Sequence, residues 1–475
     1  MVKEEASVKK KVIGLILAVV VLVALIVAVF LVLKIQKQDS SSSEVSSQVQ
    51  EISVLTINEE SIKEINVINN EDSYTLKRKN DTTFVFLGKE NTALDESKVN
   101  FFITQLSSIK AVVSANKMPE SLANYGLTKP STTLKILLND GKVLELLIGD
   151  ITPKGDSFVK TDASNEVFVV QKYTVEELTS KKLSFYNMNL PSGLTVENLN
   201  FLKIQRANAD TISIVKNEQP VSSELALSGS IGLFLDKPIS SELDSYAFND
   251  EILNKLISLS MIGTVTDDFS NKNKVKYGLD VPKYTLNYSF EDNEITLFIG
   301  DKKIDDNTEN YFCIIKGTEL IYLLPKANAP FLDITVGKIA NKLQYITNIK
   351  EVNSIKIEGQ GKNYEFLLIN SEGDNMQIKY NNKELVAEDF RTLYQTIIGI
   401  SQTDYISDKP KSSAEITITF TLKNGKVDVL KFIPYDYLSY YYSINGVDNF
   451  IVKRDSVTKV LTNAQKYING EKITV

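Results

Sequence analysis

The chain has 475 residues, with 53 basic and 60 acidic side chains and a net charge of −7. It contains no His and a single Cys, Cys313, so it cannot form an intrachain disulfide, a zinc site built from His and Cys, or a nucleophile system that needs His. The mildly acidic composition has no basic footprint for nucleic acid. We therefore expect a protein that takes no cofactor, binds no nucleic acid and is not an enzyme.

An uninterrupted apolar segment lies close to the amino terminus. Residues 12–33 carry no charged or amide side chain. A helix of that length rises about 33 Å, enough to cross a hydrocarbon core of about 30 Å. Three Lys residues at 9–11 directly precede the segment, which places residues 1–11 in the cytoplasm and the bulk of the chain outside. A cleaved signal peptide would have a shorter apolar region and a small-residue cleavage site. We therefore predict an uncleaved, single-pass anchor in the cell membrane.

A polar segment follows the predicted anchor. Residues 34–51 are rich in Ser, a composition that buries too little apolar surface to fold. We expect this segment to be a flexible linker between the membrane and the remainder of the chain.

Two motifs recur in the remainder of the chain with nearly constant spacing. Tyr125-Gly126-Leu127 is matched 152 positions later by Tyr277-Gly278-Leu279, and each is followed by Pro three residues on. Ile148-Gly149-Asp150 is matched 151 positions later by Ile299-Gly300-Asp301. A third, divergent copy lacks both motifs but has two alternating apolar segments around Asn424-Gly425, which predicts a hairpin with a type I′ turn. Chance agreement of two motifs at the same spacing is improbable, so we infer an internal repeat.

Each copy has the same predicted order of elements: an opening strand, a helix with apolar residues at spacings of three and four, a hairpin and a final strand pair. The predicted fold class is α+β, with a single transmembrane helix followed by three repeated units, each an antiparallel sheet with one main helix. The units are assigned to residues 52–178, 197–335 and 348–470. The second unit carries an extra stretch at about 221–241, which reads as an insertion that could contact a partner.

Few side chains stand out as candidates for a site. Asp150 and Asp301 could form a pair of cation sites, but a strand-ending turn explains Gly followed by Asp more simply. The Tyr-rich segment 435–442 predicts a binding surface, because Tyr is enriched at interfaces. Three of its residues are the candidates: Tyr435, Tyr437 and Tyr442. Aligning the copies pairs Tyr440 and Tyr441 with Phe158 and Val159, which predicts that these two rings pack in the core. Cys313 has apolar neighbours, which predicts a buried and slowly reacting thiol.

The ordered set of features resembles a bacterial family known as domain of unknown function 4340. The resemblance rests on the opening strand, the helix, Tyr-Gly-Leu-x-x-Pro, the hairpin and Ile-Gly-Asp, in that order. It covers the first two copies well and the third loosely. The resemblance implies a membrane-anchored, exported repeat protein associated with ABC-type transporters of the gliding-motility kind. No catalytic residue is implied.

Two classes of function remain open at this point. The first is a non-enzymatic extracytoplasmic interaction module, an accessory component of an ABC-type transporter system whose partner is that transporter or another envelope protein. The second is an envelope polysaccharide-binding protein or a hydrolase that uses carboxylates, for which Asp and Glu are plentiful although no motif selects a pair.

Overall fold

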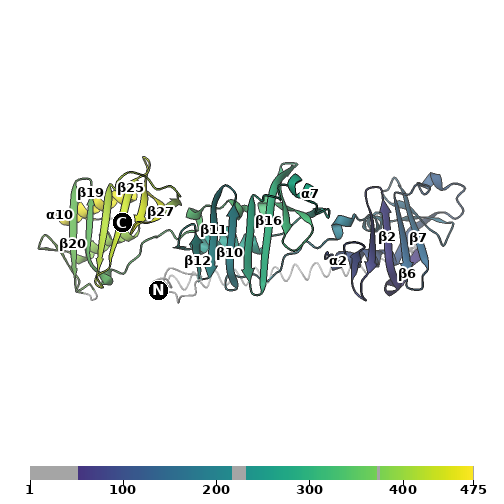
Figure 1. Ribbon diagram of the computed structural model, residues 1–475, viewed down its shortest axis with the longest axis horizontal. Coiled ribbons are helices and arrows are strands. Elements are labelled where there is room, and N and C mark those ends of the chain that lie inside the picture. The colour runs from purple at the N-terminus through teal and green to yellow at the C-terminus, as the bar shows by residue number, and fades with distance from the viewer. Residues whose placement is uncertain (1–51, 217–231, 372–374, 474–475) are drawn as a thin grey trace, which may run out of the picture. The chain divides into compact units, whose positions relative to one another are not determined.

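The computed structural model describes residues 52–216, 232–371 and 375–473 (Figure 1). The predicted cytoplasmic tail, anchor and linker, residues 1–51, lie outside these ranges, so the single transmembrane helix stays a prediction. Among the helices in the described part of the chain, none is both long and apolar enough to cross a bilayer.

The described residues form three antiparallel sheets of nine strands each, together with short helices, so the α+β class and the repetition of a sheet unit are confirmed. The strand order of the first sheet is β1-β5-β9-β8-β7-β6-β2-β3-β4. Its strands are β1 (Ile52–Thr56), β2 (Ile62–Asn69), β3 (Ser73–Arg78), β4 (Phe84–Phe86), β5 (Ser108–Asn116), β6 (Thr132–Leu138), β7 (Val143–Ile151), β8 (Ser157–Thr161) and β9 (Val167–Val170).

The second sheet has the order β13-β12-β11-β10-β15-β16-β17-β18-β14. Its strands are β10 (Leu199–Arg206), β11 (Ala209–Lys216), β12 (Leu233–Lys237), β13 (Ser241–Glu242), β14 (Gly263–Thr266), β15 (Tyr284–Phe290), β16 (Asn293–Asp305), β17 (Thr308–Ile315) and β18 (Ile321–Pro325).

The third sheet has the order β22-β21-β20-β19-β24-β25-β26-β27-β23. Its strands are β19 (Val352–Gly359), β20 (Lys362–Ile369), β21 (Gln377–Tyr380), β22 (Lys383–Leu385), β23 (Gln402–Tyr405), β24 (Ile416–Leu422), β25 (Val427–Pro434), β26 (Ser439–Ile444) and β27 (Val447–Lys453).

The three sheets share eight strands and differ in the ninth. Reading β2, β10 and β19 as equivalent opening strands makes the orders coincide from β4, β12 and β21 at one end to β5, β14 and β23 at the other. In the first sheet the ninth strand, β1, pairs with β5. In the second and third sheets the ninth strands, β13 and β22, lie at the opposite edge, beside β12 and β21. The predicted insertion at 221–241 is therefore wrong from residue 233 onward, because β12 and β13 have counterparts in the third unit, while residues 217–231 lie outside the described residues.

The predicted helices form, but the expectation of one main helix per unit is too simple. The first unit has α2 (Glu96–Ser107) and α3 (Lys172–Leu178). In the second unit α5 (Ser245–Phe248) and α6 (Asn254–Ile257) are joined by a π-helical turn. In the third unit α9 (Ala387–Ile398) packs against α10 (Arg454–Asn469), which the sequence reading missed (Figure 1). The buried residues Val457, Val460, Leu461, Ala464 and Tyr467 give α10 its apolar stripe.

The hairpin turn of the third unit differs from the predicted type I′ turn. A type I′ turn needs positive φ at both central residues, but only Gly425, at φ 85°, has it here. The N–H of Leu422 donates to the carbonyl of Lys426, as the N–H of Leu138 donates to that of Lys142 in the first unit. Both hairpins therefore close with a wider loop that places a single Gly in the left-handed region.

Candidate functional site

The two repeated motifs lie against each other in both units that carry them. The N–H of Asp301 donates to the carbonyl of Tyr277 at 2.8 Å. A Cβ on Gly300 would lie 2.8 Å from the carbonyl oxygen of Gly278, and one on Gly278, at φ 65°, would lie 2.7 Å from the carboxyl carbon of Asp301. In the first unit a Cβ on Gly126 would lie 2.5 Å from the carboxyl carbon of Asp150, and one on Gly149 would meet the carbonyl oxygen of Tyr125 and the side chain of Leu127. We call this arrangement the glycine contact; it explains why both motifs recur at one spacing.

The two Asp residues that end the second motif are part of this contact. Strand pairing shifts register between Ile148 and Ile151, and between Ile299 and Lys302, so Gly-Asp forms a β-bulge inside a continuing strand. The expected strand-ending turn is therefore wrong, because β7 and β16 both continue past the Asp. Asp301 pairs with Lys283 at 2.9 Å, with both side chains about half exposed. A structural role accounts for these residues.

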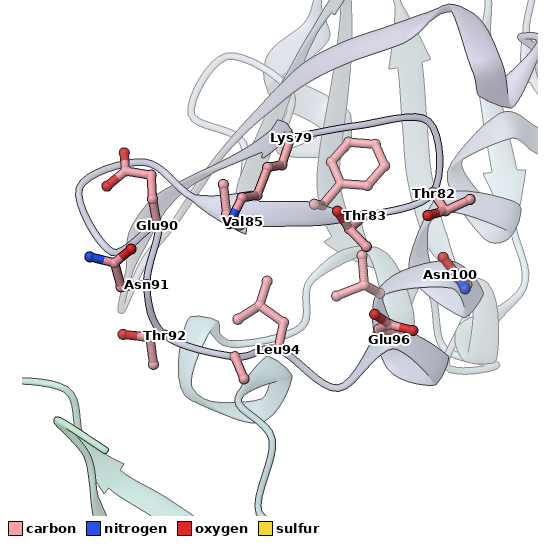
Figure 2. Close-up of a pocket in the computed structure, with 13 residues that line it drawn as sticks. Lys79, Thr82, Thr83, Val85, Glu90, Asn91, Thr92, Leu94, Glu96 and Asn100 are labelled. Carbon is pink, nitrogen blue, oxygen red and sulfur yellow. The ribbon is translucent and has the colours of Figure 1, made fainter. Parts of the chain in front are cut away.

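A pocket of about 380 Å³ lies beside β4 in the first unit (Figure 2). One wall is β4 with the turn before it, which Asn80 holds: its Oδ1 accepts from the N–H groups of Thr82 at 3.0 Å and Thr83 at 2.9 Å. The opposite wall is the segment that returns to α2, including Leu94. There Asp95 caps the helix by accepting from the N–H of Ser97 at 3.1 Å.

The pocket has a mixed lining. Its apolar members include Phe84, Val85, Leu94 and Val99, and its polar members are exposed or partly exposed. Figure 2 shows the labelled polar residues ringing the opening, among them Lys79, Thr83, Glu90, Asn91, Glu96 and Asn100. A backbone hydrogen bond from Gly88 lowers the pKa of Glu90, which therefore remains ionised at neutral pH. Such a lining suits binding better than acid–base chemistry.

In the other two units a strand occupies the corresponding place. β13 pairs with β12 through Phe234 and Glu242, and β22 pairs with β21 through Lys379 and Glu384. In the third unit Asn381 and Asn382, at φ 48° and 64°, make a two-residue turn that brings β22 back onto β21. In the first unit nine residues, 87–95, separate β4 from α2, and within the described chain no strand pairs with the outer side of β4. This segment is longer than the corresponding one in the other two units, so it does not pair with β4 and the space beside the strand remains open as the pocket. The sequence patterns did not indicate this site. The feature that could have indicated it is the length of the segment between β4 and α2.

The three candidate Tyr residues are not brought together. Tyr435 is 48% exposed and Tyr437 is 90% exposed, on the loop between β25 and β26. Tyr442 is buried, and its ring stacks on Phe432 with centroids 5.0 Å apart. Tyr442 therefore offers no surface, because β26 turns it into the core. Binding through Tyr435 and Tyr437 stays a prediction.

The predicted repeat alignment of the Tyr segment was off by one residue. Ile148 and Phe432 hold equivalent positions in the hairpins of the first and third units. On the strand that follows each hairpin, Val159 pairs with Ile148 and Tyr442 pairs with Phe432. Tyr441 and Tyr442, not Tyr440 and Tyr441, thus correspond to Phe158 and Val159. All three Tyr rings from 440 to 442 are nevertheless buried.

Two further polar features lie inside the units. Cys313 is fully buried, as predicted, and burial raises the pKa of its thiol. In the third unit the buried carboxylate of Asp428 accepts from Asn445 at 2.9 Å, Lys426 at 3.1 Å and Tyr345 at 3.2 Å. Burial opposes ionisation of Asp428, but these hydrogen bonds outweigh it and hold its pKa below the ordinary value. Among the described residues, no group of three or more metal-ligating side chains could hold an ion.

Comparison with known families finds one matching domain model, which carries no activity. Residues 85–282 match the model of DUF4340, a domain of unknown function. The match begins in β4, runs through the rest of the first sheet and ends beside the Tyr-Gly-Leu motif of the second unit, which supports the resemblance seen in the sequence. Neither the curated proteins nor the solved structures include a match to this chain.

Proposed function

We propose that this protein is a membrane-anchored extracytoplasmic interaction module that acts through its binding surfaces and serves as an accessory component of an ABC-type transporter system. The observation that carries the proposal is the pocket beside β4, a recess with a mixed lining at a sheet edge that the other two units close. The apolar segment 12–33 with its preceding Lys residues supports the anchor. The family resemblance supports the choice of partner.

Mild crosslinking of cells followed by purification of the full chain tests this proposal. We expect transporter subunits to co-purify, deletion of residues 52–475 to abolish the association, and replacement of residues 12–33 by an unrelated apolar helix to preserve it. Loss of the partner on replacing the helix alone would contradict a role for the sheet units.

The alternative, an envelope polysaccharide-binding protein or a carboxylate-dependent hydrolase, predicts a different result. The purified chain would bind or hydrolyse an envelope polymer. For a hydrolase, one carboxylate substitution, with Glu90→Gln and Glu96→Gln as the first candidates beside the pocket, would abolish turnover. We expect neither binding nor turnover.

A further inference from the structure

We propose that the outer side of β4 binds an extended peptide segment of a partner protein, which joins the first sheet as an antiparallel strand in the place that β13 and β22 take in the other units. This inference deepens the proposed function, because it names the surface and the chemistry through which the module would hold its partner.

The backbone of β4 has the groups that such a strand needs. The N–H of Leu87 donates to the carbonyl of Thr75, and the N–H of Lys79 donates to that of Thr83. Because hydrogen-bonding direction alternates along an antiparallel strand, residues 83, 85 and 87 face β3, whereas Phe84 and Phe86 direct their backbone groups outward. The carbonyl of Phe86 accepts from Lys89 at 3.0 Å. Both groups of Phe84 and the N–H of Phe86 therefore face the open side.

The protein itself shows what fits this position. In both other units an extended segment of the same chain, β13 or β22, pairs with the strand equivalent to β4. Leu243 directly follows β13, and Leu385 is the last residue of β22. In the first unit the pocket places apolar Phe84, Leu94 and Val99 beside the edge. The occupant that matches is a segment of three or more extended residues, free of Pro, with an aliphatic side chain directed into the pocket and a polar backbone along β4.

Short length is one of the devices that usually protect a sheet edge, and in the first unit it is not joined by Pro or charge on the strand. β4 is only three residues long, which limits aggregation. Leu87, directly after it, is 56% exposed. A short edge with a recess beside it favours specific pairing with one segment over unrestricted pairing with any strand.

Hydrogen exchange of the full chain in detergent micelles tests the site directly. The probe is a synthetic peptide copying residues 381–386, which include the closing strand of the third unit. The control is the same peptide N-methylated at the positions of Lys383 and Leu385, whose N–H groups face β21 in the parent hairpin. In the free protein we expect the amides of Phe84 and Phe86 to exchange at least tenfold faster than those of Ile378 and Tyr380. Millimolar probe should slow Phe84 and Phe86 at least tenfold, and the methylated control should not. Equal protection without peptide, or equal effects of probe and control, would overturn the proposal.

A chimera separates this inference from the proposed function. Replacing residues 87–94 by residues 381–386 should close the edge with the protein's own strand, protect Phe84 and Phe86 without peptide, and abolish transporter association. If the chimera folds with the edge protected and keeps the partner, while deletion of residues 52–475 loses it, the β4 site is wrong and the proposed function stands. If the chimera does not fold, the peptide measurement decides.

Discussion

The first two units and the third build the same eight-stranded arrangement around different contacts. In the first two units, Gly149 and Gly300 leave room for the backbone of a preceding turn to lie against the sheet. The hairpin register places Ile433 at the same position in the third unit. Its side chain fills that space, where it packs with Tyr441 and Ile451 under Ile406 and Ala414. In a sheet of this topology, the space beside this position can be filled either by the backbone of a turn or by a side chain, as long as it is filled.

A second difference lies five residues before those positions. Leu144 and Ile295 are buried apolar residues in the first two units, whereas the third unit buries the carboxylate of Asp428 there. That carboxylate is accommodated because it accepts from three side chains around it. The third copy diverged in the contacts that fill its layers while the strand order was kept, which is why its motifs are absent although its topology is the same.

Filling the glycine contact should destabilise the protein more than any other change considered below. Gly300→Ala would place a Cβ 2.8 Å from the carbonyl oxygen and 2.9 Å from the carbonyl carbon of Gly278. Both are backbone atoms, so relieving the clash would require the backbone to move. We expect a loss of about 3 kcal/mol or more in the free energy of unfolding. Urea unfolding of residues 52–475, with hydrogen exchange of β16 and β17 to locate the change, measures it. Gly263→Ala is the matched control, because a Cβ there meets nothing within 4 Å. A loss of similar size in the control would remove the glycine contact as the explanation.

Replacing the buried Asp428 of the third unit by Leu, the residue at the equivalent position of the first unit, should reduce the free energy of unfolding by a smaller amount. Asp428→Leu leaves the hydroxyl of Tyr345 and the amide of Asn445 without their acceptor. We expect a loss of about 1–3 kcal/mol, the cost of an unsatisfied buried polar group. Asp428→Asn keeps an acceptor oxygen and should lose less. Urea midpoints of the two variants compare them, and an Asp428→Leu chain as stable as the unchanged protein would show that the network stabilises nothing.

Acidification should distinguish the third unit from the others. Because the folded-state pKa of Asp428 is depressed, its contribution is fully present above the unfolded value of about 3.9 and is lost as pH falls through the lower folded value. We expect hydrogen exchange in β24 and β25 to accelerate more below pH 4 in the unchanged chain than in Asp428→Asn. Identical acid profiles for the two chains would contradict this linkage.

The smallest effect should come from the ion pair beside the glycine contact. Lys283 and Asp301 are each about half exposed, and such pairs contribute about 0–1 kcal/mol. Lys283→Ala should therefore change the urea midpoint little, and even less at high salt. A loss comparable to that of Gly300→Ala would mean that charge pairing, and not backbone proximity, holds the two motifs together.

The repeat, the α+β class and the final strand pairs were predictable from the amino-acid sequence, because they depend on local patterns and on positions that admit only Gly. Two motifs recur at one spacing since each supplies half of a contact that admits only Gly. The same patterns could not distinguish an insertion from β12 and β13, because a short strand at a sheet edge has no alternation long enough to identify it.

Which surfaces are available depends on contacts in the folded protein that the sequence patterns do not show. The candidates Tyr437 and Tyr442 lie five positions apart, yet one is exposed and the other buried, because a loop carries the first and a central strand the second. Asp428 looks like any acidic residue in the sequence until its three partners surround it. The open edge of β4 depends on whether the returning chain reaches the strand, and that is decided by the turn geometry of Asn381 and Asn382 in one unit and by the longer return at 87–95 in another. Burial and edge pairing are set by contacts between distant segments, which local sequence patterns do not encode.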